Sequence, residues 1–85
     1  MAVSKLPAGL VAFVKKDCPT CLLIEPVLRE LARMQSLTIY SQDDPQFPAG
    51  LPVVSDLRLD VSYHEKIEIV PTLLQVTEAG VVQRL

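Results

Sequence analysis

Two cysteines separated by two residues stand where an apolar segment gives way to a helical pattern, and this junction limits the folds open to the chain. Residues 10–15 are rich in β-branched and aromatic side chains, which is typical of a strand covered on both faces. In residues 19–34 apolar side chains recur at three- and four-residue spacing, which predicts an amphipathic helix. The motif Cys18-Pro19-Thr20-Cys21 is therefore expected at a strand-to-helix turn, and the chain is predicted to be an α/β protein.

The predicted helix carries its own start and break signals. Asp17 is placed to cap the helix, and Pro19 suits the first turn, where a backbone N–H has no helical partner. Pro26 removes one hydrogen bond inside the pattern, so a kink is expected there. The side chains expected on the buried face are Leu22, Leu23, Val27, Leu28 and Leu31.

The segments after this helix predict a second strand and a second helix. Residues 37–41 alternate in polarity and, after a crossover helix, should pair in parallel with residues 10–15. Residues 42–56 contain three prolines and are expected to form a loop, with a short extended piece at Val53 and Val54. Residues 57–67 predict a short helix that Asp56 or Asp60 could cap.

The end of the chain predicts an antiparallel hairpin. Residues 72–77 and 81–85 have strand character and flank a Glu-Ala-Gly turn. The expected order is β-α-β-α-β-β with a central mixed sheet. Residues 1–85 should form a single domain, because no segment is long enough to act as a linker between domains.

Charge and hydropathy exclude several classes of function. The net charge is −2, with eight basic and ten acidic residues spread along the chain, so no basic stripe favours nucleic acid. No apolar stretch approaches the roughly 20 residues that a membrane span needs. The first apolar run is also too short for the roughly 7 to 15 residues of a signal-peptide core, so the protein is expected to be cytoplasmic.

The placement of the cysteines predicts redox chemistry. At a helix start Cys18 lies beside unpaired backbone N–H groups and the positive end of the helix dipole, which stabilise a thiolate. Cys18 is therefore the predicted nucleophile, and Cys21, one turn further on, is the predicted resolving thiol. No cofactor is expected beyond a redox-active Cys18-Cys21 disulfide.

Other uses of the two cysteines stay open at this point. They could be small buried apolar residues or half of a metal site. A zinc site within one chain is disfavoured because only one histidine, His64, accompanies the pair, and no metal site is predicted. A metal or cluster held across a dimer by two such pairs is a third hypothesis.

Several motifs together resemble the thioredoxin superfamily. They are a strand followed by Cys-Pro-Thr-Cys at a helix start, Pro26 within the helix, and Val70-Pro71-Thr72 before a hairpin. The resemblance implies a cis Val70-Pro71 peptide bond beside the cysteines. It also implies that Val70 holds a substrate segment against Cys18 while Thr72 supports the loop. A proline after the first cysteine is closer to glutaredoxins, so Pro19 and Thr20 are expected to tune the motif.

The chain also departs from that family. Lys16 and Asp17 stand where thioredoxins usually have a tryptophan, and Ala12 stands where many bury an acidic residue that assists proton transfer. The usual N-terminal βα unit and the closing C-terminal helix are expected to be missing. An uncovered apolar sheet face would then recruit a partner, a second copy of the chain or a missing part of a longer protein.

These observations predict a thiol-disulfide oxidoreductase. Its substrate would be a disulfide-containing protein or a small thiol compound, and a reductase or glutathione would supply electrons. The alternative is a non-catalytic thioredoxin-like domain that binds a protein through the Val70 loop. His64 is expected at the surface, and Asp43 and Asp44 are expected to form a turn without a catalytic role.

Overall fold

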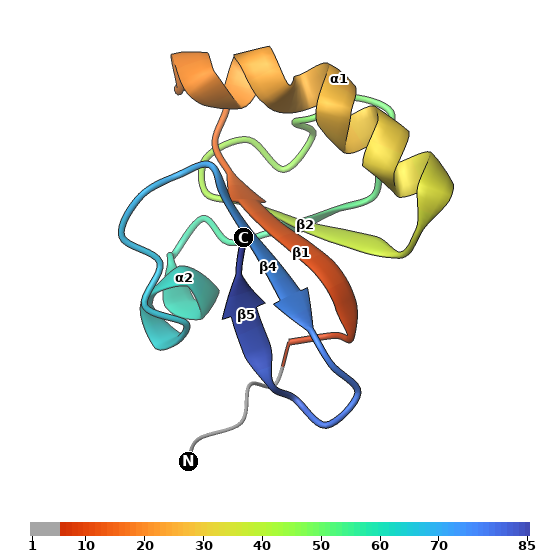
Figure 1. Cartoon of the computed structure of the whole chain (residues 1–85). Helices are drawn as coiled ribbons and strands as arrows, with labels where there is room; N and C mark the ends of the chain where they lie inside the picture. Colours follow the sequence, from red (N-terminus) through yellow and green to blue (C-terminus); the bar gives the residue numbers. More distant parts are fainter. Residues whose placement is uncertain (1–5) are drawn as a thin grey trace.

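One mixed five-stranded sheet, with strand order β3-β2-β1-β4-β5, organises the computed structural model, which describes residues 6–85 (Figure 1). Parallel pairs join β1 to β2 and β2 to β3, whereas antiparallel pairs join β1 to β4 and β4 to β5. The strands are β1 (Gly9–Val14), β2 (Leu37–Ser41), β3 (Val53–Ser55), β4 (Thr72–Val76) and β5 (Val82–Arg84). The chain is thus a small α/β domain with a mixed sheet, as the sequence predicted.

The predicted order of elements holds with one addition. The extended piece expected at Val53 and Val54 is a strand, because it pairs in parallel with Ile39 and Tyr40 at the edge of the sheet. The hairpin of β4 and β5 closes as expected, with Gln75 opposite Gln83. The expected loop 42–56 therefore ends earlier than predicted and contributes an edge strand.

Helix α1 (Pro19–Met34) has the predicted bounds and continues through Pro26, but its buried face is only partly the predicted one. Leu28 is fully buried, whereas Leu22, Leu23 and Val27 are 49%, 78% and 55% exposed. Apolar side chains occupy most of the helix circumference, so their spacing alone fits more than one face. Packing on the sheet selects the side that carries Cys21 and Leu28 and leaves a second apolar strip in solvent.

The two faces of the sheet carry separate cores. Ala12, Val14 and Ile39 pack under α1, together with Cys21 and Leu28. On the other face a second cluster consists of the buried residues Leu6, Val11, Phe13, Leu74 and Val76, with Tyr40, Val61 and Ile67 packed against them. Figure 1 shows α1 along one side of the sheet and α2 near the other.

The expectation of an uncovered sheet face is wrong for the central strands. Val11 and Phe13 are fully buried on the side opposite α1, because α2, Leu6 and Tyr40 cover them. The Phe13 ring stacks on Tyr40 with centroids 5.1 Å apart, which extends this cover to β2. Among the strands in the described part of the chain, only the edge strand β5 is exposed along its whole length.

Helix α2 (Asp60–His64) is shorter than the predicted 57–67. Leu59 and Lys66, just outside its two ends, have φ angles of 62° and 60°, which a right-handed helix does not allow. Within residues 6–85, neither helix combines the length and the apolar character that crossing a bilayer demands.

Candidate functional site

Cys18 begins α1 as its N-cap residue, a position that the sequence had suggested for Asp17. Its extended backbone lets the Sγ atom accept a hydrogen bond from the N–H of Cys21 at 3.2 Å. The Asp17 side chain is not used as a cap, since the sulfur already occupies that place. Cys18 Sγ is therefore held against the free N–H groups of the first turn, as the strand-to-helix placement predicted.

The turn that delivers Cys18 is fixed by a carboxylate from another strand end. Asp43 accepts hydrogen bonds from the backbone N–H groups of Lys16 at 2.7 Å and Asp17 at 2.9 Å. Partial burial opposes ionisation of Asp43, but the N–H groups of Asp17, Lys16 and Asp44 outweigh it and hold the pKa of this carboxyl below its usual value. Asp43 and Asp44 form turns, as predicted, but Asp43 also anchors the segment before the cysteine motif. Sequence reasoning missed this anchor.

Cys21 lies behind Cys18 and differs from it in environment. Cys21 has no exposed surface, whereas Cys18 is 9% exposed, so the first sulfur is nearer to solvent as predicted. Burial and then a hydrogen bond with Cys18 raise the pKa of the Cys21 thiol to about 12; the charges of Cys18 and Asp43 add to the rise and a backbone hydrogen bond with Lys15 opposes it. Both cysteines are free thiols. Cys21 thus stays protonated while Cys18 is a free thiol or thiolate.

The Val70 loop reaches the first cysteine. The Cys18 thiol lies 3.7 Å from the carbonyl oxygen of Val70, to which it can donate a weak hydrogen bond. The Val70-Pro71 peptide bond is cis, as the resemblance implied. The Thr72 hydroxyl donates to the Ile69 carbonyl at 2.5 Å and supports the loop. Figure 1 shows this segment, between α2 and β4, rising to the start of α1.

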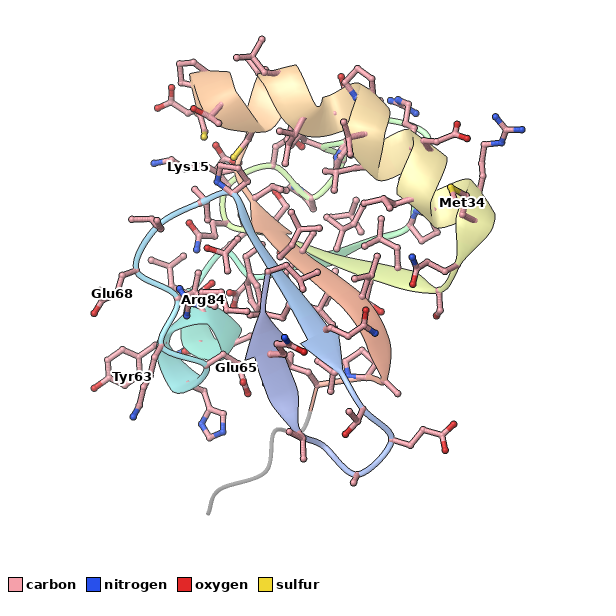
Figure 2. All side chains as sticks on the ribbon, viewed as in Figure 1. Lys15, Met34, Tyr63, Glu65, Glu68 and Arg84 are labelled. Carbon is pink, nitrogen blue, oxygen red and sulfur yellow. The ribbon has the colours of Figure 1, made fainter. Side chains whose placement is uncertain are left out.

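An open cleft of about 570 Å³ lies in front of Cys18 and is named here the Cys18 cleft. The start of α1 and the Val70 loop form one wall, while α2 and the end of β2 form the other. Figure 2 shows Lys15 beside the first turn of α1, Tyr63 standing out from α2, and Glu68 on the connection between α2 and β4. The residues that line the cleft include Cys18, Gln42, Ser62, Tyr63, Ile69 and Val70.

The α2 wall of the cleft is built from a polar network. Asp56 is 4% exposed and accepts hydrogen bonds from the N–H groups of Val61 at 3.0 Å and Ser62 at 2.9 Å. The Ser62 hydroxyl donates to the same carboxylate at 2.6 Å and accepts from Gln42 Nε2 at 2.9 Å. Asp56 was foreseen as a helix cap. The roles of Ser62 and Gln42 were missed, and the only sequence signal for them is that Asp56 precedes a helical pattern.

The remaining residues singled out in the sequence are less central. Pro19 and Thr20 are exposed on the first turn between the cysteines. His64 is exposed on α2, as expected. Within residues 6–85, no three His, Cys, Asp or Glu side chains gather where a metal ion could be held.

Comparison with known proteins adds a partial match. None of the family models compared with the chain matches it. The chain is similar to Protein TrbB of Escherichia coli (strain K12), with 36% identity over 53 residues that cover 56% of this chain and 29% of TrbB. The chain therefore spans less than a third of the length of that relative, and the similarity concerns one part of each protein.

Proposed function

We propose that this chain is a thioredoxin-like thiol-disulfide oxidoreductase. The observation that carries the proposal is the position of Cys18 Sγ, which accepts the Cys21 N–H at 3.2 Å and borders an open cleft. Cys21 is buried three residues behind it, where it can reach only Cys18 and no bulky substrate. A sulfur at the edge of a cleft, with a second sulfur fully buried behind it at a helix start, is an arrangement that suits dithiol exchange.

Two exchange steps follow from this arrangement. The Cys18 thiolate attacks one sulfur of a substrate disulfide, so a bond forms from Cys18 Sγ to that sulfur while the substrate S–S bond breaks. The departing substrate thiolate takes a proton from solvent. Cys21, as a thiolate, then attacks Cys18 Sγ, which forms the Cys18-Cys21 disulfide and releases the second substrate thiolate. The substrate gains two electrons and the cysteine pair loses them.

The environment of Cys21 orders these steps. Burial makes the largest contribution to the raised pKa of Cys21, and the hydrogen bond with Cys18 and the charge of Cys18 add to it. When Cys18 is tied up in a mixed disulfide, both Cys18 contributions vanish and the pKa of Cys21 falls. Ala12 is buried and provides no acid or base, so the proton of Cys21 passes to solvent or to the departing group. Burial still raises the pKa of Cys21, so the loss of the Cys18 contributions makes Cys21 more reactive after the first step than before it.

The partners follow from the same chemistry. A disulfide-containing protein or small molecule is the proposed substrate. A reductase or glutathione returns the Cys18-Cys21 disulfide to the dithiol. Val70, whose carbonyl lies beside Cys18, is the proposed contact for the substrate backbone, and Thr72 holds that loop.

A second candidate function is a non-catalytic domain that binds a protein at the Cys18 cleft. The limited exposure of Cys18 and the lack of an acidic residue at Ala12 favour it. The same cleft would then hold a partner without exchange of sulfur bonds.

The deciding experiment measures reduction of a disulfide-bonded test protein by the wild type, Cys18→Ser, Cys21→Ser and the control Ser55→Ala. Ser55 is exposed on the edge strand β3 and should not affect the rate. We expect Cys18→Ser to reduce activity to background, and Cys21→Ser to accumulate a mixed disulfide that mass spectrometry detects. Equal rates for the wild type and Cys18→Ser, with no trapped species, would favour the binding function instead.

A further inference from the structure

The hydrogen bonds in the polar wall of the Cys18 cleft all run the same way, from Gln42 through Ser62 to Asp56. The Asp56 carboxylate, when ionised, can only accept hydrogen bonds, so the Ser62 hydroxyl must donate its single proton to it. Ser62 Oγ can then only accept from its other neighbour. The Gln42 side chain must therefore turn its NH₂ group toward Ser62, as the 2.9 Å contact from Nε2 requires.

This chain of donors leaves one group unused. With Nε2 bound to Ser62, the carbonyl oxygen Oε1 of Gln42 takes no part in this network. Within residues 6–85 no donor bonds to Oε1, and it is not a buried atom lacking a partner, so it is open to solvent. Gln42 lines the same cleft as Cys18 and Val70. A hydrogen-bond acceptor that is not used within the described residues therefore belongs to a residue bordering the cleft in front of Cys18.

The position of Gln42 is fixed as well as its orientation. Its backbone N–H donates to the carbonyl of Val14 at 2.9 Å, which ties the residue to the end of β1, just before the cysteine turn. Holding an acceptor rigid reduces the entropy lost when a ligand binds. The Gln42 side chain is thus held from two places distant in sequence, the end of β1 at Val14 and the Asp56–Ser62 pair.

We infer that Gln42 is a specificity residue that accepts a hydrogen bond from a backbone N–H of a peptide whose cysteine reacts with Cys18. This inference rests on the proposed oxidoreductase function and narrows its substrate class to peptides and proteins. The other wall offers the Val70 carbonyl, and the exposed apolar side chains of Tyr63 and Ile69 border the cleft. A peptide has the N–H donors and the side chains to use all of these, whereas a small disulfide without N–H groups does not.

The test compares two disulfides in steady-state kinetics with the full chain. One is the disulfide-linked dimer of acetyl-Ala-Cys-Ala-amide, which carries peptide N–H groups. The other is dithiodipropionate, which has no hydrogen-bond donor at neutral pH. We expect Gln42→Ala to lower kcat/KM for the peptide disulfide by roughly three- to tenfold relative to dithiodipropionate, the effect of one neutral hydrogen bond. The loss should lie mainly in KM.

Two further variants separate recognition from a structural effect. Ser62→Ala frees the Gln42 amide to rotate, so it should lower the same ratio by a smaller factor, about two- to threefold. Gln46→Ala makes the identical substitution at an exposed loop position and should leave the ratio unchanged. Continued turnover of dithiodipropionate by each variant shows that the variant is folded.

The outcomes distinguish the two levels of the proposal. If the wild type reduces neither disulfide, the oxidoreductase function is wrong, and the inference about Gln42 fails with it. If the wild type reduces both and Gln42→Ala changes both by the same factor, the function stands and the role given to Gln42 is wrong.

Discussion

The two helices border the same cleft, but they are held in place by different forces. Helix α1 has 16 residues and packs the fully buried side chains of Cys21 and Leu28 against the sheet. Helix α2 has five residues and its only buried member is Ser62, which Asp56 holds through hydrogen bonds. Apolar burial therefore positions the sulfurs, whereas the opposite wall combines the hydrogen bonds of the Asp56 carboxylate with the partly buried contact of Val61.

This difference has a functional consequence under the proposed mechanism. The exchange steps need the two sulfurs at constant separation, and a long helix on an apolar core provides that rigidity. The opposite wall needs only to present an acceptor and a few side chains to a peptide.

The largest effect is expected for Leu28→Ala, which tests the apolar packing of α1 on the sheet. Removing a fully buried leucine leaves a cavity between α1 and the sheet, so the free energy of unfolding should fall by about 2 to 5 kcal/mol. Urea denaturation followed by circular dichroism measures it. Leu23→Ala, on the same helix but 78% exposed, is the matched control and should change stability by less than about 0.5 kcal/mol. Similar losses for both would mean that α1 does not pack through the Leu28 side.

The polar wall is tested by Asp56→Ala. Two backbone N–H groups and the Ser62 hydroxyl lose their acceptor, which should cost about 1 to 3 kcal/mol of unfolding free energy. Hydrogen exchange should also become faster at Val61 and Ser62 than in α1. Asp60→Ala is the control, because Asp60 is exposed and, within residues 6–85, its one ion pair is with Arg58 at 3.8 Å. A larger loss from Asp60→Ala would overturn the role given to Asp56.

Alkaline pH should lower the free energy of unfolding through the thiol of Cys21 in α1. Because burial raises the pKa of the folded thiol to about 12, the folded chain keeps a proton that the unfolded chain releases above its ordinary value of 9.0. This contribution to stability is complete below pH 9 and declines as pH rises toward 12, by at most about 1.4 kcal/mol per pH unit. Under reducing conditions the wild type should lose about 1 kcal/mol more than Cys21→Ala between pH 8 and pH 10. Parallel pH profiles of the two proteins would contradict the raised pKa.

The smallest effect is expected for Tyr63→Ala. Tyr63 is 86% exposed on α2, so its removal should change the unfolding free energy by less than about 0.5 kcal/mol. Thermal and urea unfolding both measure this. A loss above about 1 kcal/mol would mean that α2 depends on the Tyr63 side chain as well, and the contrast between the two helices would weaken.

Local signals predicted the elements around Cys18 well. Helix α1 has the predicted bounds because Pro19 suits a first turn and the three- and four-residue spacing extends to Met34. Its buried face was mistaken in part because apolar side chains lie almost all around it, and only contact with Ala12 and Ile39 selects one side. Helix α2 was predicted too long because the left-handed backbone of Leu59 and Lys66 has no signature in those residue types.

By itself the sequence determined where strand gives way to helix, and hence that Cys18 stands at a helix start with Cys21 one turn behind. These features depend on residues within a few positions of one another, and their chemistry is readable from spacing. Only the tertiary structure decided that Asp43 anchors the cysteine turn and that Gln42, beside the same cleft, donates a hydrogen bond to Ser62. Hydrogen bonds between residues 20 or more positions apart arise from the packing of the sheet, and no local pattern of residues encodes them.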